Sequence, residues 1–216
     1  MNLTSHDLLL IIDVQRDFCP GGRLAIAGGD AVVPAINRLA GSFEHIVLTQ
    51  DWHPANHASF ASQHPGKQAF EQIQLGYGQQ TLWPDHCVQN TPGAEFHPDL
   101  SPEVLSRAEL ILRKGFRAEI DSYSAFLEND KQTTTGLAGY LRERGFERIF
   151  IAGLAYDYCV RFSAVDAVRA GFATWVIQDA CRSVDPGSSE EAATRELAQA
   201  GVHRITVAEL LNRRGE

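Results

Sequence analysis

A junction that recurs three times along the chain decides its fold class. Each time, helix-forming residues lead to a glycine, and a short run of β-branched and apolar residues follows. Glycine directly after a helix can adopt the left-handed conformation that closes it, and a buried strand can then begin. Helices and strands that alternate in this way predict a doubly wound α/β fold with a mainly parallel sheet. The junctions are Gly145 before 149–151, Gly171 before 174–177, and Gly201 before 204–207.

Six strands are expected in this sheet, with helices on both of its faces. Asp30 is expected to open a helix before the second strand, and Ser188 with Glu191 has the pattern of a capping box. The stretch from about 51 to 100 is rich in Gln, His, Pro and Gly without a sustained period, which predicts an irregular insertion after the second strand. The predicted strands are 8–12, 46–49, 110–113, 148–152, 174–178 and 204–207.

Length and charge narrow the class of protein further. A chain of 216 residues without repeats or linker-like runs is expected to form a single domain over 1–216. The formal net charge is −8 and no basic run occurs, so neither nucleic acid nor a membrane is expected as a partner. The polar start and the short apolar run 8–12 lack the features of a signal peptide, which predicts a cytoplasmic protein. Both a monomer and a homo-oligomer remain open.

Titratable residues follow four of the predicted strands. Ligands of open parallel sheets bind beyond the carboxyl ends of the strands, so these side chains are expected to gather at one edge. The alternative is that each strand-end carboxylate only caps the helix that follows it. The residues are Asp13, Asp51, Lys114 and Asp179.

Cys159 is the candidate nucleophile. It lies between a predicted strand and a predicted helix, where unpaired N–H groups and the helix dipole are expected to favour the thiolate. The alternative is a small buried cysteine, and Cys181, near another strand end, competes for the same role. The other two cysteines, Cys19 and Cys87, are expected to pack in loops. All four are expected to be reduced. The sequence contains no Cys-x-x-Cys pair, so neither a zinc ribbon nor a thioredoxin-type site is expected.

Asp13 and Lys114 are the candidate partners of this thiol. A carboxylate beside a thiol and a lysine can accept the thiol proton, because the three groups titrate together. The alternative for Lys114 is a surface lysine whose stem lies along the protein while its ammonium stays in water.

A metal site is predicted from Asp51, His53 and His86. The first two lie two residues apart and would share one face of an extended segment, and His86 would add a third ligand. One carboxylate and two imidazoles leave coordination positions open for water or substrate. The alternative is chance spacing among eight histidines, and His57 is a plausible neighbour of the site.

Six segments together closely resemble the nicotinamidases of the isochorismatase-like cysteine hydrolases. They occur in the order found in that family and span 13–160, and their combination is far more specific than any one of them. The segments are Asp13-Val14-Gln15-Arg16-Asp17-Phe18, the run 50–57 from Gln50 to His57, Trp83-Pro84-Asp85-His86-Cys87-Val88, Lys114-Gly115, the run 121–126 from Asp121 to Phe126, and the run 153–160 from Gly153 to Val160.

The resemblance implies a role for each candidate residue. Asp13, Lys114 and Cys159 would form a catalytic triad, and the metal ligands would hold one divalent ion such as zinc, iron or manganese. A cis bond between Leu154 and Ala155 would direct the N–H groups of Ala155 and Cys159 at an oxyanion. The residues expected around the pyridine ring are Phe18, Trp83 and Tyr123, for which an ordinary aromatic core is the alternative.

The function implied by the resemblance is hydrolysis of nicotinamide to nicotinate and ammonia through a Cys159 thioester, which serves NAD salvage. Pyrazinamide-like analogues are expected to react as well. The competing hypotheses are a cysteine hydrolase of the same fold acting on another small amide or ureide, a non-catalytic metal- or ligand-binding relative, and a cysteine-based redox protein. Tyr156 departs from the family, which usually carries a small residue there, and it is expected to shape the rim of the substrate pocket.

Overall fold

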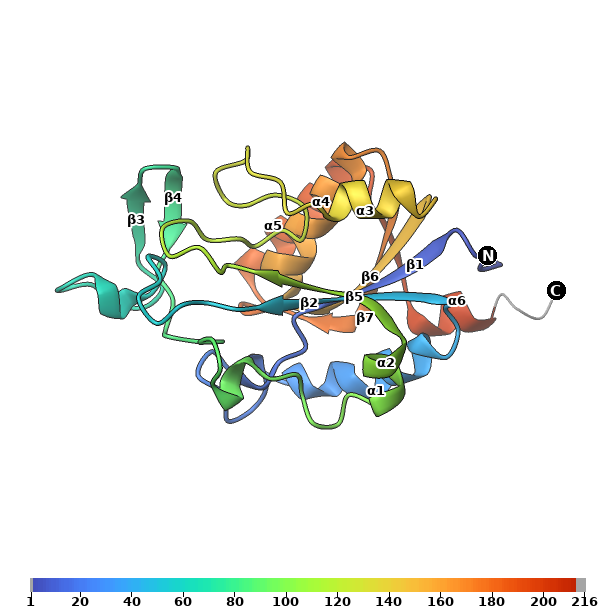
Figure 1. Cartoon of the computed structure of the whole chain (residues 1–216), viewed down its shortest axis with the longest axis horizontal. Helices are drawn as coiled ribbons and strands as arrows, with labels where there is room; N and C mark the ends of the chain where they lie inside the picture. Colours follow the sequence, from blue (N-terminus) through green and yellow to red (C-terminus); the bar gives the residue numbers. More distant parts are fainter. Residues whose placement is uncertain (1, 213–216) are drawn as a thin grey trace.

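The computed structural model describes residues 2–212 and contains a six-stranded parallel sheet in the order β5-β2-β1-β6-β7-β8 (Figure 1). Every pairing in this sheet is parallel, which confirms the predicted fold class. Strand β1, in the middle of the sheet, is buried along its whole length, as the apolar run 8–12 predicts. The strands are β1 (Asp7–Ile12), β2 (His45–Asp51), β5 (Ala108–Lys114), β6 (Arg148–Leu154), β7 (Ala173–Arg182) and β8 (His203–Ile205).

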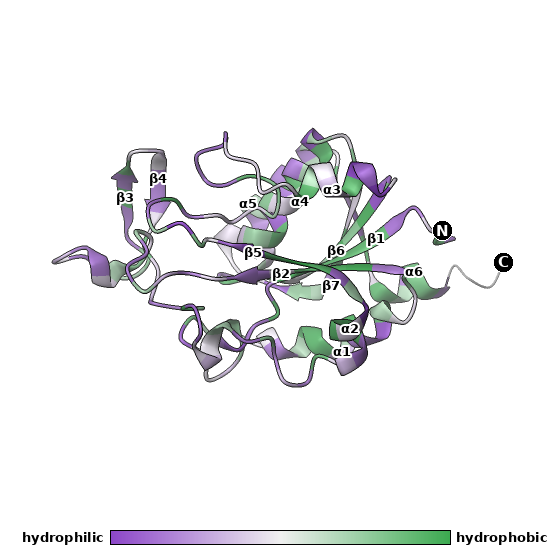
Figure 2. Cartoon of the chain, in the orientation of Figure 1, coloured by the Kyte–Doolittle hydropathy of each residue, from purple (hydrophilic) through white to green (hydrophobic). Residues whose placement is uncertain are grey.

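Helices cover both faces of the sheet, and each face has its own apolar core (Figures 1 and 2). One core contains side chains of α1 (Val32–Ala40), α2 (Pro102–Arg107) and α6 (Val207–Asn212). The other contains side chains of α3 (Leu137–Glu143), α4 (Arg161–Arg169) and α5 (Ser188–Gln199). Within residues 2–212, no helix is both long and apolar enough to cross a membrane.

The insertion after β2 is more ordered than its composition predicts. It contains an antiparallel hairpin of β3 (Gln72–Leu75) and β4 (Gly78–Thr81), which form a separate two-stranded sheet. These strands carry glutamines where a buried strand would carry apolar residues, so the periodicity signal is weak. Short helical turns occupy much of the remaining connections: η1 (Arg16–Phe18), η2 (Gly29–Ala31), η3 (Ala61–Gln63), η4 (Pro92–Ala94) and the π-helical turn η5 (Tyr156–Val160).

Two predictions require correction, one about a helix cap and one about a strand end. Ser188 is the first residue of α5 and does not cap it, because the Asp185 carboxylate accepts the N–H groups of Gly187 and Ser189 instead. Asp179 does not join the other strand-end residues. It lies within β7, and its carboxylate accepts the N–H of Val207 at the start of α6, so the capping alternative applies to it.

Candidate active site

Four buried side chains meet at the carboxyl edge of the sheet. Asp13 directly follows β1, Asp51 ends β2, and Lys114 ends β5 as the register partner of Asp51. Cys159 lies in η5, the turn that follows β6. Asp13 has a left-handed φ of 47°, which interrupts the extended backbone directly after β1. The prediction that side chains from several strands gather here is thus confirmed for three of the four strands.

Lys114 lies between the carboxylate and the thiol. Its ammonium nitrogen is 2.7 Å from Oδ2 of Asp13 and donates to Sγ of Cys159 at 3.4 Å. It also donates to the carbonyl of Ser122 at 3.2 Å. The Thr49 hydroxyl donates to Oδ1 of Asp13 at 2.6 Å and accepts the N–H of the same residue, which fixes the carboxylate. Lys114 is 1% exposed, which rules out the surface alternative.

Burial controls the protonation of this group. It raises the pKa of Asp13 to about 6, although the Lys114 charge opposes the shift. Burial also raises the pKa of the Cys159 thiol well above its ordinary value, and the Asp13 charge adds to a shift that Lys114 opposes. Burial therefore opposes the preference for a thiolate that was expected from the helix start. Asp13 lies beside the thiol as an acceptor for its proton.

The competing cysteine lies elsewhere. The Cys181 thiol donates to the carbonyl of Ile177 at 3.4 Å, and burial raises its pKa to about 12. None of the basic or acidic side chains around Cys159 contacts it.

Asp51 belongs to both the catalytic cluster and the predicted metal site. Its Oδ1 contacts the Lys114 ammonium, and its Oδ2 lies 3.8 Å from Nε2 of His86. The side-chain amide of Gln15 bonds both the N–H and the carbonyl of Asp51 at 2.8 Å, which holds its backbone. Burial alone would raise the pKa of Asp51, but Lys114 and the two histidines outweigh it and lower the pKa.

The residues predicted to hold a metal fit a divalent ion. One donor atom each from Asp51, His53 and His86 lies within 4.8 Å of the others. Nδ1 of His86 must carry a hydrogen, because it bonds the Pro84 carbonyl at 2.8 Å, so Nε2, 3.8 Å from Oδ2 of Asp51, is the ring atom that could bind an ion. Nδ1 of His53 is buried without a hydrogen-bond partner among the described residues, and a bound ion would satisfy it.

Two further residues shape this site, and sequence reasoning assigned no role to them. Asp121, in the loop after β5, accepts from Nε2 of His53 at 3.4 Å, and a carboxylate behind a metal-binding imidazole is a recurrent arrangement. Gly115 has a φ of +67°, and a Cβ there would lie 2.6 Å from Nε2 of His53. His57 packs against His53 with ring centroids 4.4 Å apart, and burial lowers its pKa to about 4, so it is a neutral neighbour.

An aromatic pocket opens in front of Cys159. Phe18, Trp83 and Tyr123 line it, where the sequence placed them, together with Ala155 and with Tyr158, which had not been identified. The ring of Tyr158 lies 4.8 Å from Trp83 and 5.5 Å from Tyr123, measured between centroids. The cavity encloses about 20 Å³. The bond between Leu154 and Ala155 is cis, as the resemblance implied.

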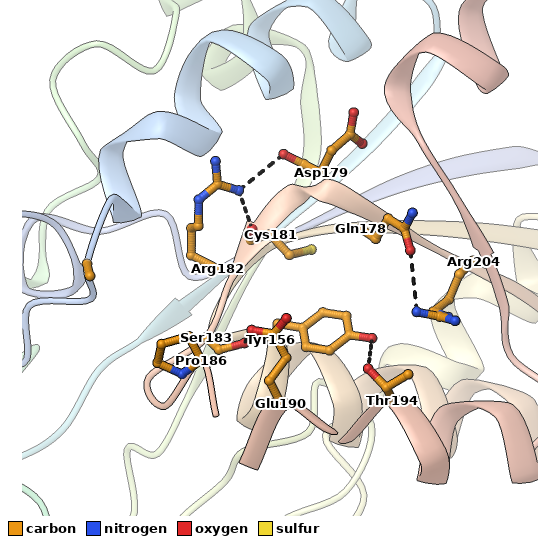
Figure 3. A pocket seen from close by; sticks show the side chains of 11 residues that line it. Tyr156, Gln178, Asp179, Cys181, Arg182, Ser183, Pro186, Glu190, Thr194 and Arg204 are labelled. Carbon is orange, nitrogen blue, oxygen red and sulfur yellow. Dashed lines mark hydrogen bonds between the residues drawn. The ribbon is translucent and has the colours of Figure 1, made fainter. Parts of the chain in front are cut away.

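Tyr156, which was expected at the rim of the substrate pocket, does not line this cavity. Its hydroxyl bonds Oγ1 of Thr194 on α5 at 2.9 Å, and the ring lines a separate cavity of about 360 Å³ with Gln178 and Arg204 (Figure 3). Ala155 is extended, and successive side chains of an extended segment point to opposite sides. Ala155 lines the pocket in front of Cys159, whereas the Tyr156 hydroxyl points toward α5.

Known proteins with the same architecture support a common origin. Residues 7–209 match the isochorismatase domain. The nicotinamidase of Acinetobacter baylyi is 52% identical to this chain over 98% of this chain and 97% of its own. A structure of a nicotinamidase/pyrazinamidase of Acinetobacter baumanii is 55% identical and superposes with a TM-score of 0.93, covering 96% of this chain and 99% of its own. The pyrazinamidase of Pyrococcus horikoshii in complex with zinc is 36% identical, with a TM-score of 0.74 over 93% of this chain and 99% of its own. This chain belongs to the isochorismatase family.

Proposed function

We propose that this protein hydrolyses nicotinamide to nicotinate and ammonia. The observation that carries the proposal is the buried contact of Lys114 with both Asp13 and Cys159 beside a pocket lined by aromatic side chains. The similarity to nicotinamidases over nearly the whole chain supports the same substrate. Pyrazinamide-like analogues, which share the carboxamide and the flat heterocycle, are proposed as further substrates.

The first half of the reaction forms a thioester. The Cys159 thiol gives its proton to Asp13 as its sulfur attacks the carboxamide carbon. The backbone N–H groups of Ala155 and Cys159 stabilise the oxyanion of the tetrahedral intermediate. The Lys114 ammonium stabilises the negative charge, whether it lies on the Cys159 sulfur or on the Asp13 carboxylate. Asp13 then returns the proton to the leaving nitrogen, and ammonia departs.

The second half releases the acid. Asp13 takes a proton from a water molecule as the water oxygen attacks the thioester carbon. The tetrahedral intermediate collapses to nicotinic acid and the Cys159 thiolate, which recovers its proton from Asp13. The product acid loses its proton to water at neutral pH and leaves as nicotinate, and the enzyme returns to its starting state.

Asp51, His53 and His86 are proposed to hold one divalent ion, and the zinc complex of the Pyrococcus horikoshii relative makes zinc a candidate besides iron and manganese. An ion held there would supply positive charge and could bind the ring nitrogen of the substrate. We propose that residues 1–216 act as one cytoplasmic domain that serves NAD salvage.

The test is direct. Purified protein is incubated with nicotinamide, and ammonia and nicotinate are quantified together. We expect equal amounts of both products, and none from Cys159→Ala. Cys181→Ala is the matched control, because it removes a buried thiol outside the site, and it should retain activity. Unaltered nicotinamide, or an active Cys159→Ala variant, would reject the proposal.

A further inference from the structure

The inserted hairpin sends one buried side chain toward the active site. Gln79 and Gln80 are neighbours on β4, but Gln79 is exposed and Gln80 is fully buried. Successive residues of a strand point to opposite sides, so the hairpin turns one glutamine to solvent and the other inward. A buried primary amide must find partners for two donors and an acceptor, and its partners here indicate its role.

The amide nitrogen of Gln80 faces three oxygens. It lies 2.9 Å from Oδ2 of Asp121, 2.8 Å from the Tyr123 hydroxyl and 2.7 Å from the Thr81 carbonyl. The carboxylate and the carbonyl can only accept, so the nitrogen must point toward them and the orientation of the amide is fixed.

The amide oxygen is held from the opposite side. It accepts from the Tyr77 hydroxyl at 3.0 Å and from the side-chain amide of Asn129 at 3.2 Å. The oxygen of the Asn129 amide in turn accepts the N–H of Tyr123 at 3.1 Å. Gln80 thus forms hydrogen bonds to the hairpin, to residues 121 and 123, and to Asn129. A hydrogen-bond network of this kind favours a single arrangement of its side chains.

Each inward partner of Gln80 does something in the site. Asp121 accepts from the His53 imidazole, one of the residues that fit a metal. Tyr123 is a wall of the pocket in front of Cys159, and its hydroxyl also accepts from the indole of Trp83 at 3.1 Å. The Gln80 amide therefore contacts both the Asp121 carboxylate, which bonds the His53 imidazole, and the Tyr123 ring, which lines the pocket.

We propose that Gln80 is a positioning residue that links the metal site to the substrate pocket. It orients His53 through Asp121, and it fixes the ring against which the substrate lies through Tyr123. The hairpin 72–81 is then a working part of the site, which it reaches through this one side chain. The statement about the pocket rests on the proposed function, whereas the statement about the metal site does not.

The test compares the same substitution at the two neighbouring glutamines. Gln80→Glu keeps the size of the side chain and its acceptors, removes the donors, and places a negative charge against Asp121. Gln79→Glu makes the same change of charge on the exposed side of the same strand. Zinc affinity is measured by competition with a chromophoric chelator, and KM and kcat are measured with nicotinamide. Circular dichroism and the melting temperature report on folding.

We expect Gln80→Glu to bind zinc about 10- to 100-fold more weakly, the range found when the partners of metal ligands are removed. KM should rise about tenfold, while Gln79→Glu stays within twofold of wild type in both measurements. A purely structural role would lower the melting temperature and the amount of active enzyme but leave KM and zinc affinity unchanged. Wild-type zinc affinity and KM in folded Gln80→Glu would therefore overturn the proposal, as would equal losses in both variants.

Tyr77→Phe keeps the question open to experiment if Gln80→Glu does not fold. It removes the hydroxyl that bonds the Gln80 oxygen at 3.0 Å and also accepts the N–H of Asp121 at the longer distance of 3.5 Å, and the same losses, smaller in size, are expected. Unchanged zinc affinity and KM in Tyr77→Phe would then count against the proposal. If the wild-type protein releases no ammonia from nicotinamide, the proposed function fails, and zinc affinity alone decides the role of Gln80.

Discussion

Asp51 and Lys114 are register partners on neighbouring strands, and the Lys114 ammonium contacts one carboxylate oxygen of Asp51 while the other oxygen faces His86. A residue that fits a metal and a residue that contacts the nucleophile therefore share one charge interaction. A cation near Asp51 would draw on its negative charge and leave more of the Lys114 charge for Asp13 and Cys159.

Metal removal is expected to slow alkylation of Cys159. Less of the Lys114 charge would then reach the sulfur, and the positive charge of the ion would be lost, so the thiol pKa would rise. We expect a several-fold slower reaction with iodoacetamide at pH 7.5 after chelation, recovered when zinc is added back. The measurement uses Cys181→Ala to simplify the count of labelled thiols. Equal rates with and without the ion would show that the two groups are not coupled.

The pH profile should report Asp13. Burial raises its pKa to about 6, and the reaction needs its unprotonated form to accept the thiol proton. As pH falls through about 6, Asp13 gains a proton, and kcat/KM should fall tenfold per pH unit below that value. Thr49→Val removes a hydrogen bond that favours the charged carboxylate, so it should move this limb to higher pH. A limb that stays in place in Thr49→Val would assign it to another group.

Gly115→Ala should impair the metal site. The φ of +67° strains any side chain, and the new Cβ would lie 2.6 Å from Nε2 of His53, so the imidazole must move. We expect at least tenfold weaker zinc binding, measured by chelator competition. Gly66→Ala is the control, because it introduces the same backbone strain at a φ of +81° with nothing within 4 Å. An equal loss of zinc affinity in both variants would mean that backbone strain, rather than contact with His53, causes the loss.

Tyr156→Phe should affect stability and not substrate choice. It removes the hydroxyl that bonds Thr194 but keeps the ring, and a lost hydrogen bond of this kind lowers the free energy of unfolding by about 1 kcal/mol. The expected result is a lower melting temperature with an unchanged KM for nicotinamide and for ring-substituted analogues. A changed preference among these analogues would return Tyr156 to the substrate site.

The sequence predicted the sheet well because buried parallel strands form apolar runs, and glycine marks the helix ends before several of them. It predicted Asp13, Lys114 and Cys159 because strand ends bring distant residues to one edge. It could not predict the side to which Tyr156 points, since that depends on the local backbone at Ala155. Asp121 and Gln80 also escaped detection, because they lie in segments without periodicity and act through partners that only the folded chain brings near.

The protonation of Cys159 shows the same limit from another side. Its position at the start of a helical turn, which can be predicted from the sequence, suggested a thiolate. The raised pKa comes from burial by residues of several distant segments, which a sequence pattern does not contain.

The size of the cavity in front of Cys159 has a kinetic consequence. About 20 Å³ accommodates roughly one water molecule, and a pyridine carboxamide is several times larger. Leu24 and Val184 line the cavity beside the aromatic rings and are its two larger aliphatic side chains. Substrate can therefore enter only when the walls of the cavity move apart. The apparent affinity for nicotinamide is then the intrinsic affinity multiplied by the fraction of molecules whose cavity is open. Shortening either aliphatic side chain should raise the open fraction, so that nicotinamide binds faster and with a higher apparent affinity.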